Sequence, residues 1–227
     1  MKAYNFLRKD MTSRVEMELP WSIGETRTFT GKIKLGRAGY HSSLTPYTAL
    51  YIAPGDMLCL VDIPEIGAGT IRDREEQVSQ SQTLVAAVDV GRELHELACK
   101  IAEDVLSIFE GEYPGDVRPR EAIATKHRWL AGLASDSELA VARDAAGEAA
   151  KDSTHVWGAW AAATAAWDAA GASSGATAAT TARAAWDATQ APLSSWDASD
   201  VTAKEKYGQW INKMLLAKLS VPPEEKE

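Results

Sequence analysis

The stretch His155–Ser199 is HVWGAWAAATAAWDAAGASSGATAATTARAAWDATQAPLSSWDAS, and it decides which fold the C-terminal half can adopt. Alanine dominates it, and alanine has the highest helix propensity because its side chain loses no rotamer entropy. The motif AAWDA occurs at Ala165–Ala169 and again at Ala184–Ala188. Because an alanine face buries little area, tryptophan must supply the apolar contact, about 200 Å² for each ring. We therefore predict an Ala-rich helical bundle held together by tryptophans.

The tryptophans of this stretch are also candidate binding residues. Trp157, Trp160 and Trp167 stand at i, i+3 and i+10, which places them on one stripe of a helix. Tryptophan is enriched at binding hot spots, so any indole that the helices leave exposed predicts a partner site or a self-association face. Covered indoles would belong to the core. The candidates are Trp157, Trp160, Trp167, Trp186 and Trp196.

The composition limits the class of protein. The chain has 227 residues, which allows one large domain or two small ones, and a formal net charge of -8. This acidic balance opposes nucleic-acid binding, which needs clustered Lys and Arg. It suits a protein that presents an acidic face to a basic partner. We expect a protein partner, with a homo-oligomer as the alternative.

The sequence carries no motif for a metal, a cofactor or a catalytic centre. Cys59 and Cys99 each lie in an apolar run and predict buried, reduced thiols. Zinc spacings, a nucleophile elbow, a phosphate loop and HExxH are all missing. The first residues lack the apolar core of a signal peptide, and charged residues interrupt the alanine stretch, so no membrane span is expected. We predict a cytoplasmic protein, in the host cytoplasm if a phage encodes it.

Residues 1–90 carry strand patterns and predict a small α+β domain. Thr45 before Pro46 favours a helix start, because threonine caps a helix and proline fits its first position. That helix is expected to end near Ile52, and the glycine-containing segment 36–43 is expected to form a turn before it. The predicted strands are Ala3–Leu7, Thr26–Leu35, Met57–Ile63 and Gln77–Val88.

Residues 91–220 predict a helical domain. Apolar residues follow the helical period without interruption from Leu94 to Phe109, which indicates a long helix over 91–110. Further helices are expected from Pro119 to about Gly132, from a cap at Asp136 or Ser137 to about Lys151, and over 200–219. The charged tail 221–227 is predicted to be disordered. The expected fold class is α+β, a small β-containing domain followed by the helical bundle.

Two resemblances to known families follow from these motifs. The N-terminal half resembles an uncharacterised phage and bacterial domain family with a Gly-aromatic-His-Ser turn, a short helix ending in Tyr, and an apolar strand. The residues that match are Gly39–Ser43, Pro46, Ala49–Tyr51 and Met57–Ile63. The C-terminal half is similar to Ala/Trp-rich proteins that are described as putative immunity proteins or as proteins of unknown function. The residues that match are Leu94–Cys99, Ala102, Glu103, Arg118–Ile123, Arg128–Leu130 and the AAWDA motifs. This resemblance concerns the family and carries little information on activity.

A third resemblance concerns the segment around His41. The turn Tyr40–Ser43, the helix with Tyr51 and the following apolar strand are similar to the middle of the ADP-ribosyltransferase fold. The resemblance implies that His41 stands near the position of the family's stacking tyrosine and that Glu75 or Glu76 offers the carboxylate. The early His-Gly of that family is missing, because no histidine precedes His41. The simpler alternatives are a histidine that orders the turn backbone and a solvated loop at 74–76.

Arg118 and Arg120 flank Pro119 at a predicted helix start, where the helix dipole disfavours cations. They are therefore candidates for a structural salt bridge or for contact with an anion or a partner.

Taken together, the residues favour a non-enzymatic interaction protein of phage or bacterial accessory type, immunity-like or anti-defence, that occupies the surface of a partner. The alternatives are an ADP-ribosyltransferase-like domain with a helical targeting module and a self-associating assembly component. The candidate binding residues are His41, Tyr40, Tyr51, Arg118, Arg120 and the five tryptophans named above.

Overall fold

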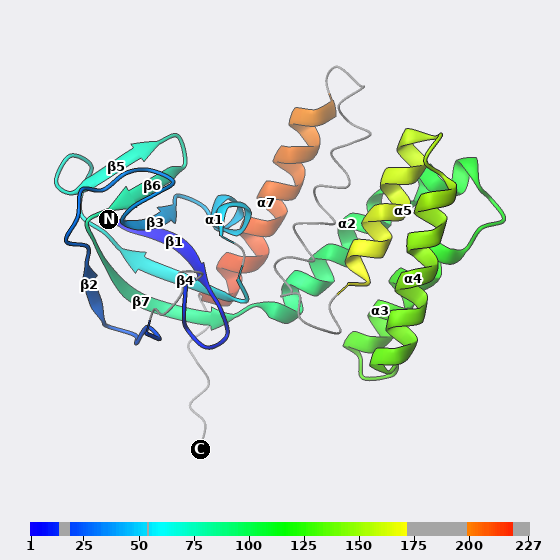
Figure 1. The fold of residues 1–227 in the computed structure, drawn as a ribbon, viewed down its shortest axis with the longest axis horizontal. Coiled ribbons are helices and arrows are strands. Elements are labelled where there is room, and N and C mark those ends of the chain that lie inside the picture. Colours follow the sequence, from blue (N-terminus) through cyan, green and yellow to red (C-terminus); the bar gives the residue numbers. More distant parts are fainter. Residues whose placement is uncertain (14–18, 54, 172–198, 220–227) are drawn as a thin grey trace. The chain divides into compact units, whose positions relative to one another are not determined.

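The computed structural model describes residues 1–13, 19–53, 55–171 and 199–219 (Figure 1). The chain forms two compact units, one with Met1–Val90 and the chain from Gly208 onward, the other with Gly91–Tyr207. An antiparallel sheet builds the first unit and helices build the second, which confirms the α+β prediction. The limits 1–90 and 91–220 stay predictions, and the tail 221–227 lies outside the described residues.

A seven-stranded antiparallel sheet, in the order β2-β7-β4-β1-β3-β6-β5, organises the first unit. The apolar strands β1 and β4 pair near the middle, with Tyr4 opposite Leu60, and the longest strand, β7, lies between β4 and the edge strand β2. The strands are β1 (Lys2–Leu7), β2 (Thr26–Thr28), β3 (Tyr40–Ser43), β4 (Met57–Asp62), β5 (Thr70–Asp73), β6 (Glu76–Ser79) and β7 (Ser81–Asp89).

The sequence analysis was wrong about several strands. Segment 40–43, predicted as part of a turn, is strand β3 between β1 and β6. The predicted strand Gln77–Val88 is broken at Gln80 into β6 and β7, and β5 was not predicted at all. The predicted strand Thr26–Leu35 ends at Thr28, and farther along Lys34 pairs with Ala38 in an isolated bridge. Short, polar strands carry no period-2 pattern that a sequence window could detect.

The two faces of the sheet carry different side chains, because successive residues of a strand point to opposite faces. On one face, Trp21 covers a cluster in which Tyr40 and Met1 also take part; its buried members are Ala3, Leu7, Trp21, Cys59, Val61, Ile63 and Leu84. Phe6, Leu58 and Val78 are buried on the opposite face. Helix α1 (Pro46–Ile52) begins after the predicted cap Thr45, whose hydroxyl accepts from the Thr48 amide.

Helix α7 (Ser199–Leu219) contributes to the sheet unit from Gly208 onward. Ile211 and Leu215 are buried, one turn apart on one face of the helix. Between them, Asn212 accepts a hydrogen bond through Oδ1 from the backbone amide of Tyr47, at 2.9 Å. This bond fixes α7 against the first turn of α1, where the amides have no partner within the helix.

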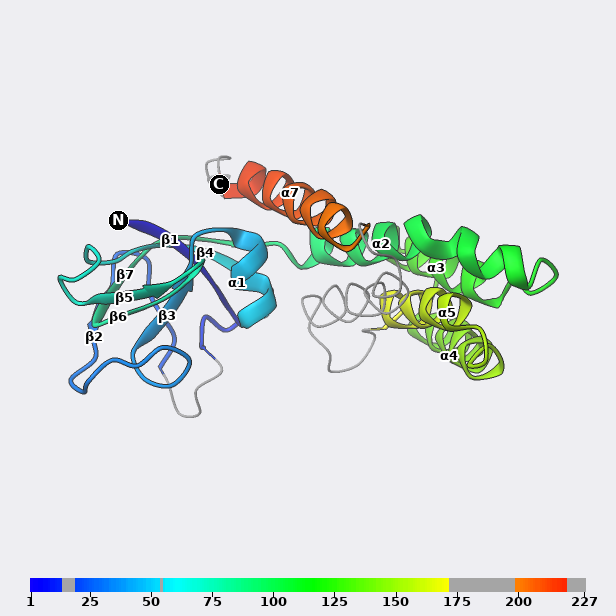
Figure 2. The same ribbon diagram turned by 90° about the horizontal axis from the view of Figure 1, so that it is seen from above.

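The second unit consists of α2 (Gly91–Glu112), α3 (Arg118–Leu130), α4 (Asp136–Asp152) and α5 (Trp157–Ala169). Helix α5 packs against α2 and α4, and α4 also packs against α3, as Figure 2 shows for α4 and α5. Ser135, rather than the predicted Asp136 or Ser137, caps α4 and forms a capping box with Glu138.

Helix α5 confirms the expected role of alanine. Its buried residues are all alanines: Ala159, Ala161, Ala162, Ala163, Ala165, Ala166 and Ala169. They surround the helix on most sides, and such small side chains let neighbouring backbones approach closely. The large rings sit where glycine makes room, since Trp167 lies against Gly147 of α4. No helix in the described part of the chain is both long and apolar enough to cross a membrane.

Candidate functional site

An exposed aromatic surface lies where α2 ends and α5 begins. We define the aromatic surface as Ile108, Tyr113, His155, Trp157 and Trp160. Trp157 is 54% exposed and Ile108 is 40% exposed, although both are large apolar residues. Exposed apolar groups that lie together are typical of binding surfaces, whereas single ones are common everywhere.

Two close contacts bring the apolar side chains of the aromatic surface together. The indole rings of Trp157 and Trp160 lie side by side with centroids 4.9 Å apart and planes tilted by 31°. Next to them, a Cβ atom on Gly158 would be 3.1 Å from Cγ2 of Ile108. Ile108 therefore lies directly on the backbone of α5, at the position beside Trp157.

Tyr113 and His155 form the polar part of the aromatic surface. The ring of Tyr113 stacks on the buried Phe109, with centroids 5.2 Å apart. Its hydroxyl forms a hydrogen bond with Nε2 of His155, 3.0 Å away. This contact ties the segment that leads into α5 to the end of α2.

The charged residues of α2 near this surface are all acidic. Asp104 and Glu112 stand four residues before and after Ile108, hence on the same side of the helix, and both are exposed. Glu110 lies between them but is engaged with Arg120, through Arg120 Nε to Glu110 Oε1 at 2.6 Å. An apolar centre with carboxylates on both sides is the resulting pattern.

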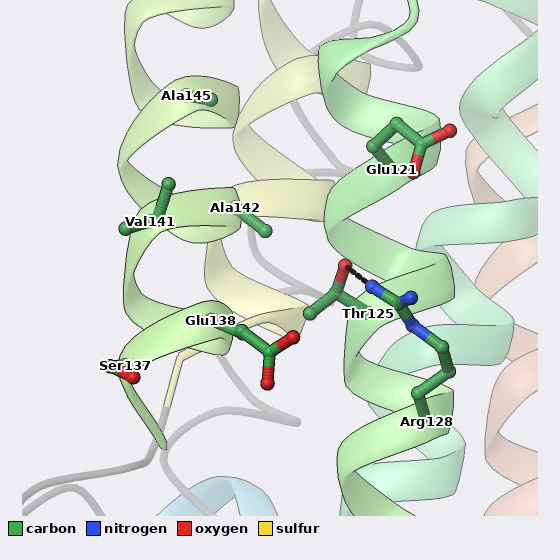
Figure 3. Close-up of a pocket in the computed structure, with 8 residues that line it drawn as sticks. All are labelled: Glu121, Thr125, Arg128, Ser137, Glu138, Val141, Ala142 and Ala145. Atoms are coloured by element: carbon green, nitrogen blue, oxygen red, sulfur yellow. Dashed lines mark hydrogen bonds between the residues drawn. The ribbon is translucent and has the colours of Figure 1, made fainter. Parts of the chain in front are cut away.

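A second candidate is the groove between α3 and α4, shown in Figure 3, with a volume of about 400 Å³. Val141 is 71% exposed in it, and Arg128 donates from Nη2 to Oγ1 of Thr125 at 3.1 Å. The carboxylates of Glu121 and Glu138 lie on opposite sides of it (Figure 3). Hydrogen bonds from the Ser135 amide and hydroxyl hold the pKa of Glu138 below its usual range, so this carboxylate serves the helix cap.

Both predicted arginines are in ion pairs, one of the two alternatives that the sequence left open. Arg118 donates from Nη2 to Asp116 at 2.6 Å and to Asp152 at 2.8 Å, and these bonds raise its pKa. The network joins the start of α3 to the end of α4. Arg120 pairs with Glu110 of α2 as described above. A role of either arginine in binding a partner stays a prediction.

The structure separates the predicted residues of the sheet unit. Tyr40 and His41 are neighbours on β3 and therefore point to opposite faces; Tyr40 packs edge-on against Trp21, with centroids 5.6 Å apart. The ring of His41 is half-buried, and burial lowers its pKa. Nε2 of His41 has no hydrogen-bond partner among the described residues. Tyr51, 48% exposed on α1, is the third predicted residue of this unit.

Glu75, one of the two carboxylates that the ADP-ribosyltransferase resemblance implies, forms hydrogen bonds with neighbouring threonines. Glu75 lies in the turn between β5 and β6, and its Oε2 accepts hydrogen bonds from the hydroxyls of Thr45 and Thr48. It thus ties this turn to the start of α1. The transferase alternative stays a prediction, which an assay with labelled NAD tests.

The five predicted tryptophans differ in what the structure places around them. Trp157 and Trp160 belong to the aromatic surface, whereas Trp167 is half-buried between helices with the guanidinium of Arg143 4.9 Å from its ring centroid. Trp186 and Trp196 lie outside the described residues.

Lys126 on α3 is a residue that the sequence analysis missed. It is fully buried, its Nζ donates to the carbonyl oxygen of Gly171 at 3.0 Å, and it lies 4.1 Å from the ring centroid of Trp129. Burial lowers the pKa of Lys126 to about 8. The ammonium thus closes the end of α5, where carbonyl groups lack partners within the helix. No pattern in the sequence distinguishes it from a solvated lysine.

Buried polar atoms also lie on the sheet face that carries the Trp21 cluster. The register pairs Tyr4 with Ser43 and Ser42 with Gln77, so Asn5, Ser42 and Gln77 stand on three neighbouring strands and share one face. Asn5 Oδ1, Ser42 Oγ and Gln77 Nε2 are buried and have no hydrogen-bond partner within the described chain. Such groups cost stability unless water or a ligand satisfies them.

Both cysteines are buried, which bears on their protonation. Burial raises the pKa of the Cys59 and Cys99 thiols to about 12, so both are protonated near neutral pH. Within residues 1–171 and 199–219, apart from 14–18 and 54, no group of His, Cys, Asp and Glu is arranged to hold a metal ion.

A comparison with protein families matches the helical part of the chain. The model of the family described as Imm-5 like putative immunity protein matches residues 90–210, more than half of the chain, and this range includes the aromatic surface and the α3–α4 groove. A search of curated proteins and a search of solved structures gave no match. The chain belongs to the family described as Imm-5 like putative immunity protein.

Proposed function

We propose that the chain is a non-enzymatic interaction protein that neutralises a protein partner by occupying its surface, as an immunity protein does. The family match supports this function, and it covers the helical unit rather than the sheet unit.

The observation that carries the proposal is the exposure of Trp157 at 54% beside Ile108. Burying a tryptophan and an isoleucine together removes a large apolar area from water, at roughly 25 cal/mol for each Å². Hot spots have this composition and are commonly rimmed by polar groups, which Tyr113, His155, Asp104 and Glu112 supply here. The partner is therefore expected to cover the end of α2 and the start of α5.

The proposal is tested by affinity capture with the full chain from a lysate of the cells that encode it. We expect one protein at a stoichiometric ratio. Expressed alone in a sensitive host, that protein should arrest growth, and co-expression of the chain should restore it. Retention of no protein, with a nucleotide found on the chain by native mass spectrometry, would refute the proposal.

A matched pair of variants tests whether the partner binds at the aromatic surface. Trp157→Ala should abolish capture and protection without loss of fold, as judged by circular dichroism. Leu133→Ala is the control, because Leu133 is also a highly exposed apolar residue, at 75%, of the same unit. It follows α3 near the start of α2, where Arg92 donates to the carbonyl oxygen of Leu130. Capture and protection should survive this change.

A further inference from the structure

We infer that the groove between α3 and α4 is the contact between two copies of this chain, related by a two-fold axis that sets each α3 antiparallel to its counterpart. Glu121 of each copy then pairs with Arg128 of the other, and Val141 lies near the axis. The groove shares no residue with the aromatic surface, so the inference goes beyond the proposed function and does not depend on it. Three observations lead to it.

The first observation is the apolar middle of the groove. Val141 is 71% exposed there, so it gains most from being covered. The residues around it are small, which lets a second pair of helices approach closely. They are Thr125 of α3 and Ala142 and Ala145 of α4, and Ala124 is exposed next to Thr125.

The second observation is a pair of opposite charges that cannot meet within one chain. Glu121 and Arg128 are both exposed on one side of α3, two helical turns or about 10 Å apart. In the described part of the chain, the carboxylate of Glu121 forms no hydrogen bond or ion pair. The guanidinium of Arg128 donates one hydrogen bond, to Oγ1 of Thr125 at 3.1 Å, and forms no ion pair with Glu138 across the groove. Both charges are therefore available to a second chain.

The third observation is the order of these residues, which is self-complementary. In a two-fold contact, residue i of one copy faces residue j of the other, and j faces i in return. With the axis between Ala124 and Thr125, Glu121 faces Arg128 of the other copy, and symmetry gives the same pair again. A second copy thus matches both charges of α3. A uniformly basic partner would instead face Arg128, and a uniformly acidic one would face Glu121.

The same axis suits α4. Figure 3 shows Val141 and Ala142 in the middle of the groove, with Ala145 toward one end and Glu138 toward the other. An axis between Val141 and Ala142 therefore brings the two Val141 side chains near each other and sets Glu138 opposite Ala145 of the other copy. Apolar groups meet at the centre, and the carboxylate does not face a like charge.

The test measures the mass of the full chain by analytical ultracentrifugation from about 5 to 500 µM, in salt that screens the net charge of -8 on each copy. We expect a monomer–dimer equilibrium with a dissociation constant on the order of 100 µM, because the contact is small. Val141→Lys should weaken the dimer about tenfold, since two ammonium groups would meet near the axis. Leu133→Lys, the same change at an exposed apolar residue outside the groove, should leave it intact.

Charge reversals test the orientation. Glu121→Arg and Arg128→Glu should each weaken the dimer about tenfold, because like charges then face each other at both symmetric positions. An equimolar mixture of these two variants should dimerise again, because each position then faces an opposite charge. Arg37→Glu is the control, since Arg37 is exposed in the sheet unit and the change alters the net charge as Arg128→Glu does. Circular dichroism checks that every variant is folded.

A chain that stays monomeric at every concentration, dimers that persist in Glu121→Arg, or a mixture that stays monomeric would each overturn the inference. Dimers that are lost in Trp157→Ala but kept in both charge variants would also overturn it and assign self-association to the aromatic surface. The proposed function can fail separately. If the chain dimerises as expected but no protein is retained from the lysate, the dimer stands and the proposed function is rejected.

Discussion

Ile108 of α2 rests on the backbone of Gly158 in the first turn of α5, where a Cβ atom would approach Cγ2 of Ile108 to 3.1 Å. Gly158→Ala therefore has two opposing effects on stability. Alanine favours the helix over glycine by about 1 kcal/mol, while Ile108 must move by a few tenths of an ångström. Because Ile108 is partly exposed, it can yield, and we expect the free energy of unfolding to change by less than about 0.5 kcal/mol.

Binding should respond differently from stability in this variant. The substitution displaces Ile108 within the aromatic surface, so we expect capture of the partner to weaken severalfold while the denaturation midpoint stays close to that of wild type. Chemical denaturation and the capture assay measure the two quantities. An unchanged capture would show that the partner does not contact Ile108.

The pH dependence of stability should reveal the buried Lys126. Its pKa in the folded chain is about 8, against 10.5 for an exposed lysine, because burial disfavours the ammonium. Between these values the unfolded chain binds more protons than the folded chain, so stability rises with pH across this window, by on the order of 3 kcal/mol. Below pH 8 Lys126 is protonated in both the folded and the unfolded chain, so this gain in stability is absent.

Urea denaturation of the full chain at pH 7.5 to 10.5 measures this slope. Lys126→Met should remove it, whereas the exposed Lys100 of α2 provides the control Lys100→Met, which should keep it. A slope that persists in Lys126→Met would assign the titration to another group.

His41 should affect the stability of the fold at acidic pH. Burial lowers its pKa below 6.5, so as the pH falls below 6.5 the unfolded chain takes up a proton before the folded chain does. Its contribution is complete above pH 6.5 and is lost as the pH decreases toward the lower pKa of the folded state. His41→Gln should therefore flatten the curve of stability against pH just below pH 6.5. Urea denaturation of wild type and His41→Gln in parallel measures this, and equal curves would assign the titration to another group.

The sequence predicted those helices that are specified by residues close together in the chain. The period of Leu94 to Phe109 predicted α2, the pair Thr45–Pro46 predicted the start of α1, and the alanine run predicted α5. These signals rest on helix propensity, capping and a 3.6-residue repeat, which do not depend on distant contacts. The same stretch also named Trp157 and Trp160, but which indole remains exposed depends on how α5 packs against α2.

The elements that could not be predicted depend on contacts between distant segments. Strand β3 contains Ser42 and Ser43, both buried, and its pattern of small polar residues is typical of a turn. In the sequence, Lys126 cannot be distinguished from a surface lysine. Its burial results from contacts with Trp129 and Gly171 in the folded chain. Ile108 appears in sequence as one more core position of an amphipathic helix, and its exposure follows from where α2 passes the start of α5.

The buried hydroxyl of Ser42 provides the last prediction. Its Oγ is buried and has no hydrogen-bond partner among the described residues. Ser42→Ala should raise the free energy of unfolding by about 1 kcal/mol, because it deletes an unsatisfied polar group and leaves only a small void. Ser79→Ala is the matched control on strand β6, since Oγ of Ser79 donates to the carbonyl oxygen of Tyr40 at 3.4 Å. Thermal or urea denaturation should show that Ser79→Ala lowers stability. If Ser42→Ala also lowers it, the prediction is wrong, and the loss of packing or of a hydrogen bond to a bound water exceeds the gain from deleting the buried hydroxyl.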